Sequence, residues 1–325
     1  MQSRWWIWGV AGLLVVGLAA GGWAVSTRHQ PAPPSAGAGA GASASPAGKL
    51  LGATTDLTVR VGAAERHYLM YVPAGYRQGQ PAALVVAYHG EGSTAADFLT
   101  QTSLPAAADT YHFLLAVPQG WRPAPGQPAS PTANPQSWND GAGRTPAAKA
   151  KVDDAGFTLA LLADVKRRYT VNAHRTYALG YASGGSLVLQ LGLTQPASFA
   201  AVAAGAPNAF TPATLSPAGR VPFIVIQGGA DPLVSKTTTG HTVNQLAQAF
   251  GCKTSVQTRT VVTGVTAATY PMCPVGMTAS YIYVDDMGHT WAGGHGGLSN
   301  LVTGPDSPAV SATELAWQFL GSQQR

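Results

Sequence analysis

Residues 175–185 decide the fold, and they read Arg175-Thr176-Tyr177-Ala178-Leu179-Gly180-Tyr181-Ala182-Ser183-Gly184-Gly185. The first five residues are typical of a buried strand, and the glycine-rich end is typical of a tight turn into a helix. A turn that presents one side chain at its tip needs small residues two positions before and two positions after that side chain. Gly180 and Gly184 stand in this relation to Ala182. The stretch therefore predicts a strand, a sharp turn and a helix in succession.

Apolar runs rich in β-branched or aromatic residues predict five further strands, at residues 67–72, 83–88, 113–117, 222–227 and 279–284. The near-continuous run Leu84-Val85-Val86-Ala87 indicates a strand covered on both faces, as in a parallel sheet. Helical patterns lie between the strands. Apolar positions from Phe157 to Tyr169 share one helical face, and Asp306-Ser307-Pro308 predicts the start of a last helix. This alternation predicts the fold class α/β, a mostly parallel central sheet with helices on both faces.

Chemically useful residues follow four of these strands at their carboxyl ends, where active sites gather in open α/β sheets. In chain order they are His89-Gly90-Glu91, Ala182-Ser183, Asp231 and His289. The sequence thus places a candidate oxyanion loop, a turn suited to a nucleophile, an acid and a histidine. This is the order of a hydrolase triad, in which the histidine takes the nucleophile's proton and the acid orients the histidine.

Together these motifs resemble the secreted poly(3-hydroxybutyrate) depolymerase and feruloyl-esterase-like branch of the α/β-hydrolase superfamily, over roughly residues 55–321. Besides the turn at Ala182, the resemblance is carried by Tyr71-Val72-Pro73, His89-Gly90, Ser137-Trp138-Asn139, Val152-Asp153-Asp154-Ala155-Gly156-Phe157, Ala230-Asp231-Pro232, Gly288-His289-Thr290-Trp291 and the two cysteines. The resemblance implies one α/β-hydrolase domain that cleaves carboxylic esters without a metal or an organic cofactor. It also implies that Asp231 and His289 are the acid and the base of the triad.

The turn departs from the family pattern at the nucleophile. Aligned residue by residue, the family's serine falls on Ala182, whose methyl group cannot attack an ester, and the next residue is Ser183. A register shifted by one would make Ser183 the nucleophile, but it would place Tyr181 where little more than glycine is tolerated. Ser183 is therefore a candidate catalytic residue, and the alternative is a hydroxyl in the first turn of a helix. Gln227 also stands where the family often has a histidine.

A second departure lies in the oxyanion loop. Glu91 stands at a place usually held by an uncharged residue, and a carboxylate there opposes the negative charge of a tetrahedral intermediate unless it points to solvent. His89 is expected to brace this loop. Trp138 and Trp291 are candidate substrate-binding walls for an apolar or aromatic acyl group, and His295 is a candidate for the border of the pocket.

The first fifty residues differ in composition from the rest of the chain. Residues 5–25 carry no charge, are long enough to cross a bilayer as a helix and have tryptophans at both ends. Residues 1–29 are therefore predicted to be a signal anchor or, alternatively, a cleaved signal peptide. Residues 30–48 are almost entirely Pro, Ala, Gly and Ser, which predicts a linker. The α/β-hydrolase domain is expected at residues 49–325, exported to the cell envelope or the extracellular space, with residues 5–25 as a membrane anchor if they are retained.

Charge is scarce in this sequence. The 325 residues include 19 Lys and Arg and 14 Asp and Glu, so charged side chains make up 10% and apolar side chains 46%. High apolar content and little charge are not typical of a disordered chain. Three basic residues and no acid lie before residue 51, which leaves a net charge of +2 on residues 51–325. The domain therefore lacks the dense basic composition that a nucleic-acid partner requires.

Cys252 and Cys273 are the only cysteines in the chain. Behind an export signal, a single pair is predicted to form one disulfide, with two buried free thiols as the alternative. Two isolated cysteines without histidines at ligand spacing do not make a zinc site.

Two hypotheses of function follow. The first is a carboxylic ester hydrolase of the polyhydroxybutyrate depolymerase or feruloyl esterase type, which acts through Ser183 or at a much reduced rate. The second is a catalytically silent relative that binds a ligand or a partner in the cell envelope. In both, the expected ligand is an uncharged ester or acyl compound, either a small molecule or a polymer, and no cofactor is expected. Without a serine, the pair of His289 and Asp231 could still polarise a water molecule.

Overall fold

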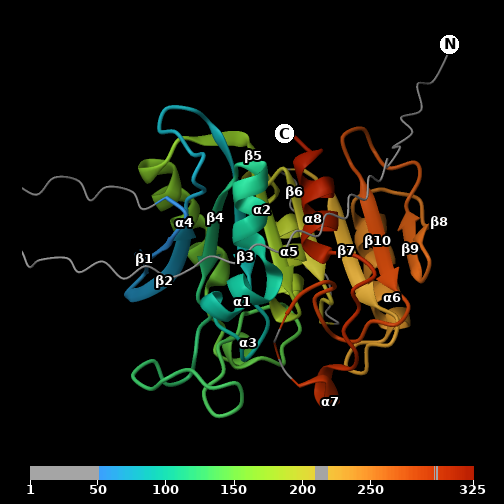
Figure 1. Cartoon of the computed structure of the whole chain (residues 1–325), viewed down its shortest axis with the longest axis horizontal. Coiled ribbons are helices and arrows are strands. Elements are labelled where there is room, and N and C mark those ends of the chain that lie inside the picture. Colours follow the sequence, from blue (N-terminus) through green and yellow to red (C-terminus); the bar gives the residue numbers. More distant parts are fainter. Residues whose placement is uncertain (1–50, 209–218, 296, 298) are drawn as a thin grey trace, which may run out of the picture. The chain divides into compact units, whose positions relative to one another are not determined.

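A ten-stranded sheet runs through the part of the chain that this computed structural model describes, residues 51–208, 219–295, 297 and 299–325 (Figure 1). The strand order from one edge to the other is β1-β2-β4-β3-β5-β6-β7-β10-β9-β8. The six strands from β4 to β10 in this order are parallel, and the two outer strands on each side pair antiparallel. The strands are β1 (Thr54–Val61), β2 (Ala64–Tyr71), β3 (Ala82–Tyr88), β4 (Leu114–Pro118), β5 (Val171–Tyr181), β6 (Ala201–Gly205), β7 (Phe223–Gly228), β8 (Gln257–Val262), β9 (Val265–Thr269) and β10 (Ala279–Val284).

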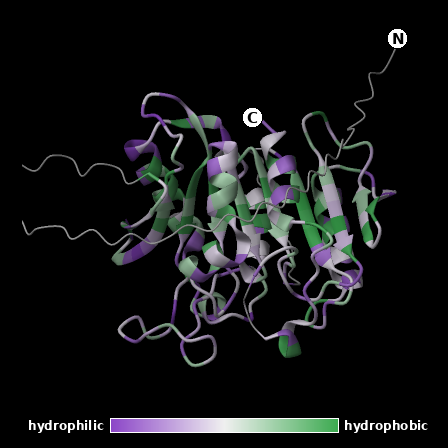
Figure 2. Cartoon of the chain, viewed as in Figure 1, coloured by the Kyte–Doolittle hydropathy of each residue, from purple (hydrophilic) through white to green (hydrophobic). Residues whose placement is uncertain are grey.

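Helices cover both faces of the sheet. One face is packed by α4 (Asp154–Arg168), α5 (Ser183–Thr194) and α6 (Lys236–Ala249), and the opposite face by α1 (Ala95–Thr102), α2 (Leu104–Tyr111) and α8 (Ala312–Gly321). Two four-residue helices, α3 (Pro146–Lys149) and α7 (Asn300–Thr303), and a 3-10 helix at Pro196–Ser198 lie in the connections. The side chains of β3 show why both faces must be covered, because all of them from Ala83 to Tyr88 are buried and alternate between the two hydrophobic clusters. In Figure 2, many of the strongly hydrophobic residues lie within the strands of the sheet.

The predicted fold class is confirmed, and each of the six predicted strands coincides with an observed strand, namely β2, β3, β4, β5, β7 or β10. The strands β1, β6, β8 and β9 were not predicted. β6 has the sequence AVAAG, in which a single β-branched residue gives little strand signal.

The predicted start of the last helix is wrong. The helix α8 begins at Ala312, and the Ser311 hydroxyl accepts the backbone N–H of Glu314 as its cap. The carboxylate of Asp306, at the predicted start, accepts a hydrogen bond from the side chain of Asn300.

The disulfide between Cys252 and Cys273 is present, as predicted. It joins the end of α6 to the loop after β9, and closing a loop of this size stabilises a fold by about 3 kcal/mol in the chain-entropy account. A structural disulfide is typical of an extracellular or otherwise oxidising environment.

In the described ranges, no helix combines the length and the apolar character needed to cross a bilayer. The predicted anchor at residues 5–25 and the linker at residues 30–48 lie outside the described residues.

Candidate active site

Ala182 stands at the tip of the strand-to-helix turn between β5 and α5. Its backbone angles are φ 50° and ψ −117°, which for a residue with a side chain is a strained conformation. The Ala182 N–H donates to the backbone oxygen of Gly205 on the neighbouring strand β6, and this bond ties the turn to the sheet. This is the geometry of a nucleophile elbow, with alanine in the place of the nucleophile.

Close backbone contacts explain why glycines flank this turn. A Cβ atom at Gly180 would lie 2.2 Å from the backbone oxygen of Gly184, and a Cβ at Gly184 would lie 2.3 Å from the backbone oxygen of Tyr88. Both distances are far below any real carbon–oxygen contact, so neither position accepts a side chain. The small residues that the elbow needs are therefore placed symmetrically around Ala182, as the sequence predicted.

Ser183, the alternative nucleophile, is the first residue of α5 and has no exposed surface. Its Oγ atom is buried and has no hydrogen-bond partner. Ser183 does not line the pocket beside the elbow, whereas Ala182 does. The structure therefore brings Ala182, and not Ser183, together with the other candidate catalytic residues.

Asp231 and His289 form a buried pair beside the elbow. Asp231 lies in the loop after β7 and His289 in the loop after β10, and Oδ2 of Asp231 is 2.8 Å from Nδ1 of His289. Since a carboxylate only accepts, Nδ1 carries the hydrogen, and Nε2 is the atom left to act in the pocket. Burial alone would raise the pKa of Asp231, but its hydrogen bond with His289 and two backbone N–H bonds lower that pKa below its ordinary value.

The hydrogen bonds that hold Asp231 and His289 in place were not predicted. The side-chain amide of Gln227 donates to Oδ2 of Asp231 at 2.6 Å, and the backbone N–H groups of Leu233 and Val234 donate to Oδ1 at 2.8 Å each. The Tyr181 hydroxyl donates to the backbone oxygen of His289 at 2.6 Å. The resemblance had marked Gln227 as unusual, but only the fold shows that it holds the acid.

The oxyanion loop follows β3, and its His89 is fully buried, as a bracing role requires. Nδ1 of His89 lies 2.8 Å from the backbone oxygen of Gly90, and Nε2 accepts the N–H of Gly120 at 3.0 Å. Burial lowers the pKa of His89 to about 4, so the ring stays neutral at pH 7. The loop lies close to the elbow, because a Cβ built at Gly90 would be 3.3 Å from the Cβ of Ala182.

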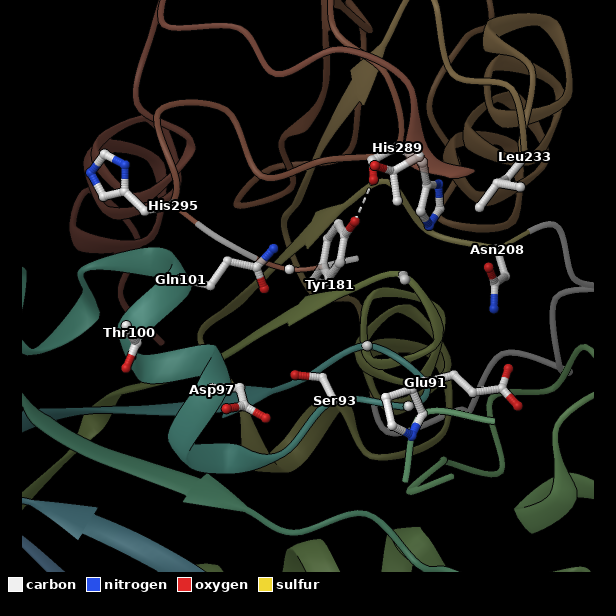
Figure 3. Close-up of a pocket in the computed structure, with 16 residues that line it drawn as sticks. Glu91, Ser93, Asp97, Thr100, Gln101, Tyr181, Asn208, Leu233, His289 and His295 are labelled. Carbon is white, nitrogen blue, oxygen red and sulfur yellow. Dashed lines mark hydrogen bonds between the residues drawn. The ribbon is translucent and has the colours of Figure 1, made fainter. Parts of the chain in front are cut away.

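A cavity of about 560 Å³ opens between the elbow, the oxyanion loop and the histidine (Figure 3). Its described lining includes the expected Gly90, Glu91, Ala182, His289 and His295. Residues not predicted to line it are Gly92, Ser93, Asp97, Thr100, Gln101, Pro131, Tyr181, Asn208, Leu233, Gly297 and Thr303. Most of these come from α1 and from loops after strands, which no local sequence pattern connects to the triad. Within the described residues, the backbone N–H groups of Ser183 and Glu91 donate no hydrogen bond to another backbone group.

The two candidate tryptophans lie behind the pocket and do not line it. Trp138 is fully buried, and its indole N–H donates to the backbone oxygen of His89 at 2.8 Å. Trp291 is buried against Phe98 and Tyr181, and its N–H donates to the Thr313 hydroxyl. Their observed contacts are those of packing residues that support the oxyanion loop and Tyr181.

A parallel sheet with an elbow after β5, an acid after β7 and a histidine after β10 defines the α/β-hydrolase fold with an esterase-type site. The chain belongs to the phospholipase/carboxylesterase family, whose family model matches residues 76–267. It is an esterase-like member, and the esterase relatives below imply ester substrates for the family.

Two relatives and one solved structure illustrate this kinship. "Putative esterase NocK" of Nocardia uniformis subsp. tsuyamanensis is 27% identical over 302 residues, which cover 82% of either chain. Feruloyl esterase B of Neurospora crassa is 32% identical over 146 residues, covering 44% of this chain and 45% of the relative. The structure of an acetyl xylan esterase from Aspergillus awamori superimposes with a TM-score of 0.53 at 16% identity, over 69% of this chain and 89% of that chain. The last comparison bears on the fold alone.

Proposed function

We propose that this protein binds an ester or acyl ligand in the pocket beside Ala182 and does not turn it over through a serine nucleophile. The backbone of Ala182 carries the proposal, because φ 50° and ψ −117° place its methyl group at the tip of the elbow. The hydroxyl of Ser183, the next residue along the chain, is buried and outside the pocket.

The remaining groups are suited to hold an acyl group. The backbone of Glu91 and Nε2 of His289 both border the cavity, so the N–H of Glu91 can donate to a carbonyl oxygen and Nε2 can meet a second polar atom of the ligand. The side chains of Leu233 and Pro131 add apolar surface to the same cavity. Without a hydroxyl at Ala182, no acyl-enzyme forms at this position, so a bound ester stays intact.

A second candidate function is slow hydrolysis by a water molecule. The intact bond between Asp231 and His289 favours it, because a histidine held in the Nδ1–H form can take a proton from water through Nε2. The expected rate is far below that of an intact triad, which gains most of its advantage from the positioned nucleophile.

The decisive experiment measures hydrolysis of p-nitrophenyl butyrate by the native protein and by the variants Ala182→Ser and Ser183→Ala. We expect the native protein to have little or no activity, and Ala182→Ser to raise kcat/KM by about 10³-fold or more. A serine-directed phosphonate should label Ala182→Ser and leave the native protein unlabelled. Ser183→Ala should behave as the native protein does.

Two controls make the result interpretable. The double variant Ala182→Ser with Glu91→Gln tests whether the carboxylate in the oxyanion loop limits the restored enzyme, and it should be more active than Ala182→Ser alone. Native activity that disappears in Ser183→Ala would make Ser183 the nucleophile and would overturn the proposal. Native activity that survives Ser183→Ala but disappears in His289→Ala would establish the water mechanism instead.

The finer points of ligand and location rest on the sequence. The resemblance to polyhydroxybutyrate depolymerases and feruloyl esterases favours a hydroxyalkanoate or aromatic acyl group as the part held beside Ala182. The disulfide and residues 1–29 favour a domain at residues 49–325 that acts outside the cytoplasm, joined by the linker at residues 30–48 to an anchor at residues 5–25. Recovery of the protein with both thiols free from the cytoplasm would contradict this location.

A further inference from the structure

Gln101 is a buried residue whose side-chain amide lines the cavity beside Ala182. It lies in the last turn of α1 and is 8% exposed, and Figure 3 shows its side chain pointing from α1 into the cavity, toward Tyr181. Within the described residues, this amide makes no hydrogen bond, although the backbone oxygen of Gln101 accepts the N–H of His295. Because buried amides nearly always have a partner, a group from outside the chain is expected to satisfy this one.

The amide of Gln101 is held in place by its surroundings. The loop that contains Gly297 packs against it, since a Cβ built at Gly297 would lie 2.9 Å from Nε2 of Gln101, and glycine there leaves the room that the amide occupies. The helix α1 is fixed at both ends, because Thr94 caps its first turn and the backbone oxygen of Thr102 accepts the Thr313 hydroxyl. A polar group on a rigid element can select a ligand without first being ordered.

The chemistry around this amide favours a neutral hydroxyl as its partner. An amide has an acceptor oxygen and N–H donors, and a hydroxyl both accepts and donates, so the two form hydrogen bonds without any change of charge. The described lining of the cavity has no lysine or arginine that could neutralise a carboxylate. Ser93 and Thr100 bring hydroxyl groups to the same cavity, but these already donate to backbone oxygens, those of Thr94 and Ala96. The amide of Gln101 is therefore the better donor to a ligand on this side of the cavity.

We propose that Gln101 determines the ligand specificity of this pocket by binding a hydroxyl group of the ester, on the part of the ligand that lies against α1. This inference rests on the proposed function, since it presupposes an ester with its carbonyl beside Ala182. A ligand with a methyl group in place of the hydroxyl leaves the buried amide unpaired, which makes it the weaker binder.

Pairs of esters that differ only in a hydroxyl and a methyl group test the proposal. One series pairs ω-hydroxyalkyl butyrates, from hydroxypropyl to hydroxyhexyl, with alkyl butyrates of the same chain length. A second series places the hydroxyl or the methyl group at the end of the acyl chain of ethyl esters. Ligand-observed NMR titration of the full-length protein gives the Kd of each ester. In the pair whose length reaches Gln101, we expect the hydroxyl ester to bind about tenfold tighter.

The variant Gln101→Met keeps the size of the side chain and removes its hydrogen bonds. It should abolish the preference for the hydroxyl esters and bind the alkyl esters at least as tightly as the native protein does. It should also raise the Tm, because an apolar group replaces an unpaired amide. The control inside the pocket is Thr100→Val, whose hydroxyl already has a partner, and the control for the substitution is Gln318→Met at an exposed position of α8. Both controls should keep the preference.

The possible failures are distinguishable. Equal and measurable binding within every pair, a preference that survives Gln101→Met, or a lower Tm of that variant would overturn the role of Gln101 and leave the proposed function standing. Tighter binding of an ester that ends in a carboxylate than of the matched hydroxyl ester would overturn the assignment to a hydroxyl. Binding of none of the esters would overturn both proposals.

Discussion

Two parts of the candidate active site differ in how closely they match an esterase: the Asp231–His289 pair, and the elbow together with the oxyanion loop. On one side, Asp231 and His289 retain both their residue types and their bonds, including the support of Asp231 by Gln227. On the other side, the elbow and the oxyanion loop carry Ala182 and Glu91 at the positions where the family resemblance leads us to expect a serine and an uncharged residue.

The difference shows that the geometry of an elbow does not depend on the nucleophile that it usually presents. The shape at Ala182 is fixed by two glycines, at which any Cβ atom would clash with a backbone oxygen, and by a hydrogen bond to β6. None of these contacts involves the side chain at the tip. An alanine at the tip is therefore compatible with the fold of the elbow, whereas removal of the acid or its support would leave buried polar groups unpaired.

The largest expected effect tests whether Asp231 and His289 can still act as the acid and base of a triad. In the Ala182→Ser background, Asp231→Asn should lower kcat for p-nitrophenyl butyrate about 10⁴-fold, because an amide cannot hold His289 in the Nδ1–H form. The control Asp285→Asn, which removes an exposed carboxylate paired with Lys236, should leave kcat unchanged. A decrease of less than about tenfold would mean that the pair has no catalytic competence left.

The next effect tests whether the elbow is held by backbone contacts. Gly184→Ala should cost about 4 kcal/mol of unfolding free energy, or prevent folding, since its Cβ would lie 2.3 Å from the backbone oxygen of Tyr88. Gly240→Ala in α6 is the matched control. Its Cβ would lie 3.7 Å from the Tyr281 ring, an ordinary contact, so this change should stabilise the protein by about 1 kcal/mol. Urea unfolding of the two variants measures both values, and similar effects would refute the argument.

The burial of His89 in the oxyanion loop predicts that the stability of the protein depends on pH. The ordinary pKa of histidine is 6.5, and burial lowers that of His89 to about 4, so the unfolded chain binds one more proton than the folded chain between these values. Stability should therefore fall as the pH falls through this window, by about 3 kcal/mol from this residue. In His89→Gln, urea unfolding at pH 7 and pH 4.5 should show a smaller decrease. An unchanged decrease would assign the acid sensitivity to other groups.

The smallest effect separates the two serines of the first turn of α5. Ser183→Ala should stabilise the protein by about 1 kcal/mol, because it removes a buried hydroxyl without a partner. Ser186→Ala should destabilise it by a similar amount, since the Ser186 hydroxyl donates to the backbone oxygen of Asn208 at 3.0 Å. Thermal unfolding measures both, and a destabilising Ser183→Ala would indicate a bonded hydroxyl at that position.

Five of the six parallel strands and the order of the site residues were predictable from the sequence, because most buried parallel strands are continuous apolar runs and each functional residue directly follows one; the exception is β6, whose alanines give little strand signal. The outer strands β1 and β8 were not predicted: β1 is only partly buried, although Leu57, Val59 and Val61 alternate with polar residues in it, and five of the six residues of β8 are exposed. The start of α8 was misplaced because Asp306-Ser307-Pro308 has the composition of a helix start, but the observed cap is Ser311, a few residues further on.

At the site, the sequence identified the tip of the elbow and its partners but not what surrounds them. The positions of Glu91 in the cavity and of Ser183 outside it depend on loop conformations that no local pattern determines. Asn208, Gln101 and Asp97 reach the pocket from elements far apart in the chain, so they become visible only when the sheet brings these elements together.

The strained backbone of Ala182 also bears on how this protein changes over generations. Alanine and serine codons differ by a single base, so one mutation would place a hydroxyl at a turn that is already shaped to present it, next to a histidine that is already oriented. The strain at this turn amounts to about 1–3 kcal/mol and is maintained by the surrounding packing. A lineage that carries this chain therefore stands one substitution away from the means of attacking an ester, without any rearrangement of the fold.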